Sequence, residues 1–206
     1  MLIFMRHNLV FLAAPKTGTT ALESELRPHC SIEVRNPPGM RHMGARRYRR
    51  QWAPFLRDVH KFEGETMAVL REPLSWLQSW YRYRSRDAIK GTSRSTAGIS
   101  FDQFIEAVLA EDQPDFANVG EQEYFASLGN GKIGIDHLFT YEDFDKPLAF
   151  LCDRLGRNIK VPERNVSPAR PLALSGDLET ELRRKRANEF ALYARIAEAG
   201  HLQATG

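Results

Sequence analysis

Residues 13–21 read Ala-Ala-Pro-Lys-Thr-Gly-Thr-Thr-Ala and lie between two segments of different character. An apolar run, Leu9–Leu12, comes before them, and a pattern with leucines on one helical face comes after. This order predicts a buried strand, a turn containing Gly18, and then a helix. The first amides of a helix attract anions, and Lys16 adds a full positive charge. The stretch therefore predicts a cradle for a phosphate-like group.

The 206-residue chain is expected to form one domain, residues 1–206. It is 42% hydrophobic and 27% charged, which is ordinary for a globular enzyme. No apolar run reaches about 18 residues, so no membrane span is expected. An Arg-His-Asn interruption near the N-terminus favours two short strands over a signal peptide. Cys30 and Cys152 are far apart and favour free thiols, so we expect a cytoplasmic protein.

The positive charge of the chain is concentrated in one segment. No acidic residue lies between Val34 and Arg57, and without the seven arginines of this segment the net charge falls from +3 to −4. Such a local patch favours an anionic ligand over general nucleic-acid affinity, so no specific nucleic-acid partner is expected. The seven are Arg35, Arg41, Arg46, Arg47, Arg49, Arg50 and Arg57.

Short apolar segments alternate with helical patterns along the chain. Strands are expected at residues 2–5, 9–13, 31–35, 66–70, 137–141 and 159–161. Helices are expected at residues 20–28, 44–53, 101–109, 122–128 and 178–199, after Pro73, and between Asp143 and Gly156. Polar residues 85–100 predict a surface loop long enough to act as a lid. The alternation predicts an α/β fold, a P-loop-like three-layer sandwich with a mainly parallel central sheet.

Two of the expected helices carry further detail. Tyr48, Trp52 and Phe55 recur at helical spacing and predict an aromatic stripe packed on the core, with Pro54 ending or kinking that helix. The last helix is expected to be continuous and to be capped by Ser175 or Asp177.

The order of residues in the cradle excludes the usual nucleotide P-loop. That loop requires Gly-x-x-x-x-Gly-Lys followed by Ser or Thr. Here Lys16 precedes Gly18, and the motif contains a single glycine. A phosphate-like group would therefore be bound in a different register. No His, Cys, Asp or Glu cluster has metal-ligand spacing, so no metal is expected.

A second anion-binding element follows the strand expected at residues 66–70. Arg71 ends this strand, and Ser79 lies eight residues further on, in the helix that begins at Pro73. A guanidinium and a hydroxyl placed in this way can bind one phosphate together. The alternatives are an ion pair of Arg71 with Glu72 or Glu142 and a surface position for Ser79.

With these two motifs the chain resembles the sulfotransferase superfamily that uses 3′-phosphoadenosine 5′-phosphosulfate (PAPS). Pro15-Lys16-Thr17-Gly18-Thr19-Thr20 is similar to the family's 5′-phosphosulfate loop, and Leu70-Arg71-Glu72-Pro73 with Ser79 is similar to its 3′-phosphate motif. Residues 139–144 and 151–156 resemble a later strand–helix unit. Asn165-Val166-Ser167 and the terminal helix resemble the membrane-type and bacterial branch.

The chain departs from the family pattern at two places. Trp76 occupies a position where many relatives carry another arginine, and the terminal Arg-Lys-Gly segment that grips the 3′-phosphate in cytosolic relatives is missing. Arg170 lies in the loop where a substitute contact could arise. We therefore include Arg170 among the candidate donor-binding residues.

The resemblance implies in-line transfer of a sulfuryl group from PAPS to a hydroxyl or amine, without a metal. Lys16 would stabilise the bridging oxygen of the leaving phosphate. The amides of residues 17–20, together with the hydroxyls of Thr19 and Thr20, would hold the 5′-phosphate. The family uses His or Glu as the base, and His42 is preferred here over Glu23 and Glu33.

The acceptor is expected to be a small molecule or carbohydrate. The basic, aromatic residues 41–50 favour an anionic or sugar-like one. Two alternatives remain: a nucleotide- or polyanion-binding module without sulfuryl transfer, and a small-molecule kinase. The missing Walker lysine and the lack of an acidic Mg²⁺-holding motif disfavour the kinase. The sequence does not define the oligomeric state.

Overall fold

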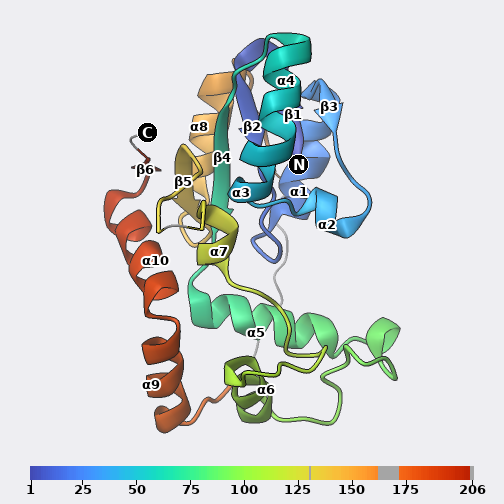
Figure 1. The fold of residues 1–206 in the computed structure, drawn as a ribbon, viewed down its shortest axis with the longest axis vertical. Helices are drawn as coiled ribbons and strands as arrows, with labels where there is room; N and C mark the ends of the chain where they lie inside the picture. Colours follow the sequence, from blue (N-terminus) through green and yellow to red (C-terminus); the bar gives the residue numbers. More distant parts are fainter. Residues whose placement is uncertain (130, 162–171, 205–206) are drawn as a thin grey trace.

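The computed structural model describes residues 1–129, 131–161 and 172–204, and these contain one mixed sheet. The strand order is β3-β1-β2-β4-β5-β6 (Figure 1). The strands are β1 (Leu2–Phe4), β2 (Leu9–Phe11), β3 (Ile32–Glu33), β4 (Glu65–Leu70), β5 (His137–Thr140) and β6 (Leu202–Gln203). The central strands β2, β4 and β5 are parallel, whereas β1, β3 and β6 run antiparallel to their neighbours. The α/β class is confirmed, but the predicted parallel pairing is restricted to the centre.

The sheet begins with the predicted pair of short strands. Strand β1 leads through the turn η1 (Met5–His7) to β2, and Leu2 pairs with Phe11. Asn8 has a left-handed backbone (φ 48°), a conformation that asparagine adopts more readily than most residues. The turn therefore reverses the chain and directs β2 toward the Pro15–Thr20 loop.

Helices cover both faces of the sheet because apolar side chains alternate between the faces along each strand. Ile3, Val10 and Leu138 face one cluster, and Phe11 and Phe139 face the other. The first cluster includes residues of α3 (Ala45–Arg47), η3 (Tyr48–Trp52), α4 (Ala53–His60), α7 (Gln122–Ala126) and α10 (Ala187–Ala199). The second includes residues of α1 (Thr19–Leu26) and α8 (Asp145–Leu155).

A third apolar cluster lies beyond the carboxyl ends of the parallel strands (Figure 1). It joins α5 (Pro73–Arg84), α6 (Phe101–Leu109) and α9 (Gly176–Lys185) around Trp76, Phe104 and Leu182. The predicted start of α6 is confirmed: Ser100 and Gln103 form a reciprocal capping box. This helical layer covers the end of the sheet where the cradle is located.

Several element boundaries differ from the prediction. Helix α1 ends at Leu26, and the chain continues through η2 (Arg27–His29) before β3. The helical segment predicted at 44–53 consists of α3, η3 and then α4, and Pro54 lies in the first turn of α4 instead of ending a helix. In the aromatic stripe, Tyr48 is buried but Phe55 is 48% exposed. The remaining short elements are α2 (Pro38–Arg41) and η4 (Asp87–Ile89).

The C-terminal region also differs. The long helix predicted at 178–199 is broken at Arg186 into α9 and α10, and Ser175 precedes α9 without making a side-chain cap. No strand forms at 159–161; Ile159 is instead buried beside α8, where its amide donates to Cys152 Sγ (3.3 Å). Both cysteines are free thiols, as predicted. Among the described helices, none has the length and apolar character needed to cross a bilayer.

Candidate functional site

The carboxyl ends of β2, β4 and β5 bring together the two predicted anion motifs. The first motif follows β2, Arg71 follows β4, and Tyr141 follows β5. The Arg71 guanidinium carbon lies 4.7 Å from the centroid of the Tyr141 ring. A Cβ at Gly18 would lie 2.6 Å from Tyr141 Cε2, and the φ of Gly18 is 70°. Only glycine fits this turn without strain, because both the space and the backbone conformation exclude other residues.

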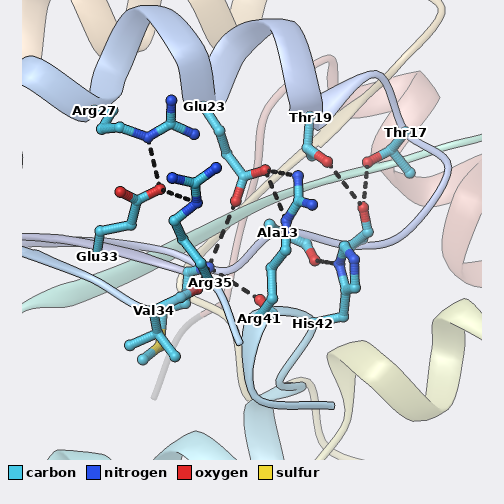
Figure 2. A network of polar contacts seen from close by, with 12 residues as sticks. Ala13, Thr17, Thr19, Glu23, Arg27, Glu33, Val34, Arg35, Arg41 and His42 are labelled. Atoms are coloured by element: carbon cyan, nitrogen blue, oxygen red, sulfur yellow. Dashed lines mark hydrogen bonds and ion pairs between the residues drawn. The ribbon is translucent and has the colours of Figure 1, made fainter. Parts of the chain in front are cut away.

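The loop is held from inside by its own threonines. The hydroxyls of Thr17 and Thr19 both donate to the carbonyl of Ala14, at 3.0 and 3.4 Å (Figure 2). Both contacts shape the loop; Thr17 is fully buried, whereas Thr19 also lines the groove described below. Thr20 is exposed and lines the same groove, and its contact with a phosphate stays a prediction.

A helix of the third cluster also holds this loop. Trp76 Nε1 donates to the carbonyl of Pro15 at 2.8 Å, although the indole is 99% buried. Trp76 thus binds the main chain of the cradle from α5. No described group outside the helix accepts a hydrogen bond from the main-chain amides of residues 17–20. These amides are therefore available to an anion.

A groove of about 1440 Å³ runs along this edge of the sheet. Ser79 and the acids Glu142 and Asp145 contribute to its lining. Among the described residues that line the groove, cationic side chains outnumber acidic ones. Such an excess of positive charge favours an anionic ligand. These cations are Lys16, Arg41, Arg71, Arg84, Arg86 and Arg94.

Lys16 is the most perturbed of these cations. Burial, together with the nearby Arg86 and Arg71 guanidinium groups, lowers its pKa to about 8. Its Nζ lies 4.2 Å from the centroid of the Tyr83 ring, and Arg86 lies over the same ring at 4.6 Å. Clustered cations repel one another and so raise the electrostatic free energy of the site. A bound anion would offset this repulsion.

The expected alternative role of Arg71 is not found in the described chain. Glu72 instead accepts a hydrogen bond from the Ser75 amide (2.7 Å), and Glu142 accepts one from the Tyr193 hydroxyl (2.8 Å). The Arg71 Nε donates to Ser75 Oγ at 2.9 Å, so its charge is not paired with either acid.

Ser79, the second member of the predicted 3′-phosphate pair, lines the groove together with Arg71. No described residue forms a hydrogen bond with the Ser79 hydroxyl. The hydroxyl is therefore available to a ligand in the groove. Arg170 lies outside the described residues.

His42 lies between this groove and a second pocket. Its Nδ1 is 2.8 Å from the carbonyl oxygen of Ala13 (Figure 2). A carbonyl only accepts, so Nδ1 carries the proton and the neutral ring has its lone pair on Nε2. Burial lowers the pKa of His42, an effect opposed by the hydrogen bond to Ala13. The imidazole is thus neutral near pH 7 and has the form that a general base requires.

The two glutamates weighed as alternative bases are engaged elsewhere. Glu23 is buried and forms an ion pair with Arg41, and its carboxylate also lies 3.6 Å from the Met1 amino group (Figure 2). Glu33 accepts a hydrogen bond from Arg27 Nε at 2.7 Å. These pairs leave His42 as the best-placed base among the three.

The second pocket has a volume of about 620 Å³ and shares Pro15 and His42 with the groove. Three of the seven clustered arginines line it, namely Arg46, Arg47 and Arg50. The other four bind acids: Arg49 pairs with Asp136, and the remaining pairs are Arg35–Glu33, Arg41–Glu23 and Arg57–Asp58. The basic segment therefore has two roles: four of its arginines form ion pairs within the fold, and three line a pocket.

Sequence reasoning missed two further features of the site. Gln122 holds both main-chain groups of Arg71: its Oε1 accepts from the Arg71 amide and its Nε2 donates to the carbonyl, each at 2.8 Å. Glu189 Oε1 accepts a hydrogen bond from the main-chain amide of Gln122 at 2.8 Å, and Arg186 Nη1 donates to the other carboxylate oxygen of Glu189. Burial raises the pKa of Glu189, although Arg186 opposes this. Arg86 was missed as well, despite its place in the basic run at residues 82–86.

Among the described residues, no group of His, Cys, Asp and Glu is arranged to hold a metal ion. Comparisons with protein-family models, with curated proteins and with solved structures gave no match. The function therefore has to be inferred from the chemistry of these residues.

Replacing Gln122 by Ala should lower the free energy of unfolding by about 2–4 kcal/mol, because both main-chain groups of Arg71 lose their partner and Glu189 Oε1 loses the Gln122 Nε2 donor at 3.3 Å. Urea denaturation would measure the change. Gln51→Ala is the matched control, because Gln51 is exposed and its side chain forms a hydrogen bond with just Arg47 among the described residues; its effect should stay below about 0.5 kcal/mol. A similar small loss in Gln122→Ala would contradict the proposed support of Arg71.

Proposed function

We propose that the chain is a sulfotransferase that moves the sulfuryl group of PAPS to a hydroxyl or amine, using a P-loop-like three-layer fold. The observation that carries this proposal is the shared groove: Lys16 and the α1 N-terminus line it together with Arg71 and Ser79. Two phosphate groups on one nucleotide match two anion-binding elements in one groove. The free thiols of Cys30 and Cys152 suit a reducing, cytoplasmic compartment.

In this mechanism the main-chain amides of residues 17–20 bind the 5′-phosphate, and Arg71 and Ser79 bind the 3′-phosphate. The acceptor oxygen forms a bond to sulfur while the bond from sulfur to the bridging oxygen breaks. The electron pair of the broken bond remains on that oxygen, where the charge of Lys16 stabilises it. The products are a sulfate ester and adenosine 3′,5′-bisphosphate.

His42 is proposed as the general base. Its protonated Nδ1 is bound to Ala13, so Nε2 is the nitrogen that would take the acceptor's proton. His42 lines both the groove and the pocket, which fits a base acting between donor and acceptor. A small-molecule or carbohydrate acceptor would therefore enter through the 620 Å³ pocket.

The groove's cations would also suit a nucleotide- or polyanion-binding module without transfer, and a small-molecule kinase is the third possibility. These functions differ in the ligand they require. Thermal unfolding with adenosine 3′,5′-bisphosphate, AMP, ATP and a DNA oligomer separates them. At a concentration of about 100 times its Kd, the bisphosphate should raise Tm by about 5 °C or more. A shift with ATP but none with the bisphosphate would overturn the proposal.

Lys16→Ala should lower turnover of PAPS by about 10²-fold or more, because one donor to the transition-state charge is lost. A labelled-PAPS assay measures turnover, and circular dichroism checks the fold. Lys185→Ala is the control, since Lys185 is exposed on α9, away from the groove lining. Near-normal turnover of Lys16→Ala would remove Lys16 from this role.

The pH profile of kcat/KM should be bell-shaped. Protonation of His42 removes the base, and its lowered pKa puts this loss below pH 6.5. Deprotonation of Lys16 removes the stabilising charge, so activity should fall again above about pH 8. The acid side of the profile should disappear in His42→Asn, with turnover reduced about 10²-fold.

His60→Asn serves as the control for the histidine substitution, because His60 is exposed at the end of α4. Residual activity of Lys16→Arg should lack the fall above pH 8, since a guanidinium stays protonated there. Full activity of His42→Asn with intact bisphosphate binding would contradict the assignment of the base.

A further inference from the structure

Two arginines of the 620 Å³ pocket have no partner in the described chain. Arg46 and Arg50 are exposed, and neither forms a hydrogen bond or ion pair with another described residue. Arg47 differs, because its Nε donates to Gln51 Oε1 and its Nη1 donates to the Gly39 carbonyl. The pocket therefore presents two unneutralised guanidinium groups. Arginine binds carboxylates, sulfates and phosphates through paired, planar donors.

The rest of the pocket suits a ring-bearing molecule of limited size. Its lining includes the aromatic residues Trp76, Phe125 and Tyr124, of which Tyr124 is the exposed one, at 64%. Sugar or aryl rings pack well on such surfaces. The volume also lies within the range of about 300–1,000 Å³ typical of small-molecule sites. One or two rings fit here, whereas a nucleic-acid duplex does not.

Charge favours an anionic occupant of this pocket. Glu121 is the one acidic residue of its described lining, and it lies 4.0 Å from Arg186. Arg46 packs closely on Gly129, since a Cβ there would lie 3.0 Å from Arg46 Nη1. Arg46 and His42 line the same pocket, so one molecule could place a carboxylate or sulfate at Arg46 and another part at His42.

We infer that the acceptor carries its own anionic group, a carboxylate, sulfate or phosphate, bound by Arg46 and Arg50 while its reacting hydroxyl or amine lies beside His42. This inference rests on the proposed function. Arg46 and Arg50 would hold the acceptor through its anionic group, which takes no part in the reaction. Arg46 and Arg50 are then specificity residues, and the chemistry remains with Lys16 and His42.

Isothermal titration of matched acceptors into bisphosphate-saturated protein tests the inference. The probes are 4-nitrophenyl β-glucuronide and 4-nitrophenyl β-glucoside, which differ in one carboxylate. The glucuronide should bind about tenfold tighter or more, as charge-assisted hydrogen bonds allow. In the double variant Arg46→Gln and Arg50→Gln the preference should fall below about twofold. Arg57→Gln should behave as wild type, because Arg57 lies outside the pocket and pairs with Asp58.

Three results would overturn the inference: equal binding of the two glycosides, a preference that survives in the double variant, or no binding of either glycoside. Failure of the proposed function is seen separately, as absence of bisphosphate binding and of labelled transfer to both glycosides. In that case the glycosides are titrated into protein without the bisphosphate. A preserved, arginine-dependent preference would then retain the anion pocket but remove its role as an acceptor site.

Discussion

Three parallel strands, β2, β4 and β5, end at the same edge of the sheet, and the residues that follow each of them form the groove. Parallel pairing has this consequence because all carboxyl ends point the same way. The pairing of Leu70 with Thr140 and of Phe11 with Met67 sets how far each strand extends. A shift by one residue in either ladder would reverse the facing of the side chains.

The cations gathered at this edge repel one another, and this repulsion destabilises the folded protein when no anion is bound. Lys16 shows the effect most clearly, because burial and two guanidinium groups lower its pKa. Below pH 8 the charge is present in both the folded and unfolded states, and the full penalty applies. Between about pH 8 and 10.5 the folded state releases the proton first, so stability rises with pH in that window. The apolar clusters must offset this penalty, and an anion in the groove would relieve it.

Local signals predicted much of the fold and two of the loops that line the groove. The turn before Leu9, the strand ending at Leu70 and the helix beginning at Phe101 each depend on neighbours in sequence. Pro54 was ambiguous, since proline both ends one helix and begins another. The break at Arg186 was hidden, because its buried contact with Gly120 spans 66 positions.

Long-range partners are the part that a single sequence does not contain. Thr66 and Asp136 are 70 positions apart, and Gln122 and Arg71 are 51 apart. Nothing local to either member of these pairs indicates the other. The same limit applies to Arg41 and Arg49 of the basic segment, because their acidic partners Glu23 and Asp136 lie 18 and 87 positions away.

Gln122 has a consequence for how the two cavities communicate. Its side chain grips the main chain of Arg71, which faces the groove, and the same residue lines the neighbouring pocket. A molecule in the pocket that moves Gln122 would therefore move Arg71 as well. Thermodynamic linkage makes such an effect mutual: if occupancy of one cavity changes affinity in the other, the reverse change has the same factor. The Gln122 side chain thus provides a physical route for cooperativity between a ligand in the pocket and a ligand in the groove that do not contact each other.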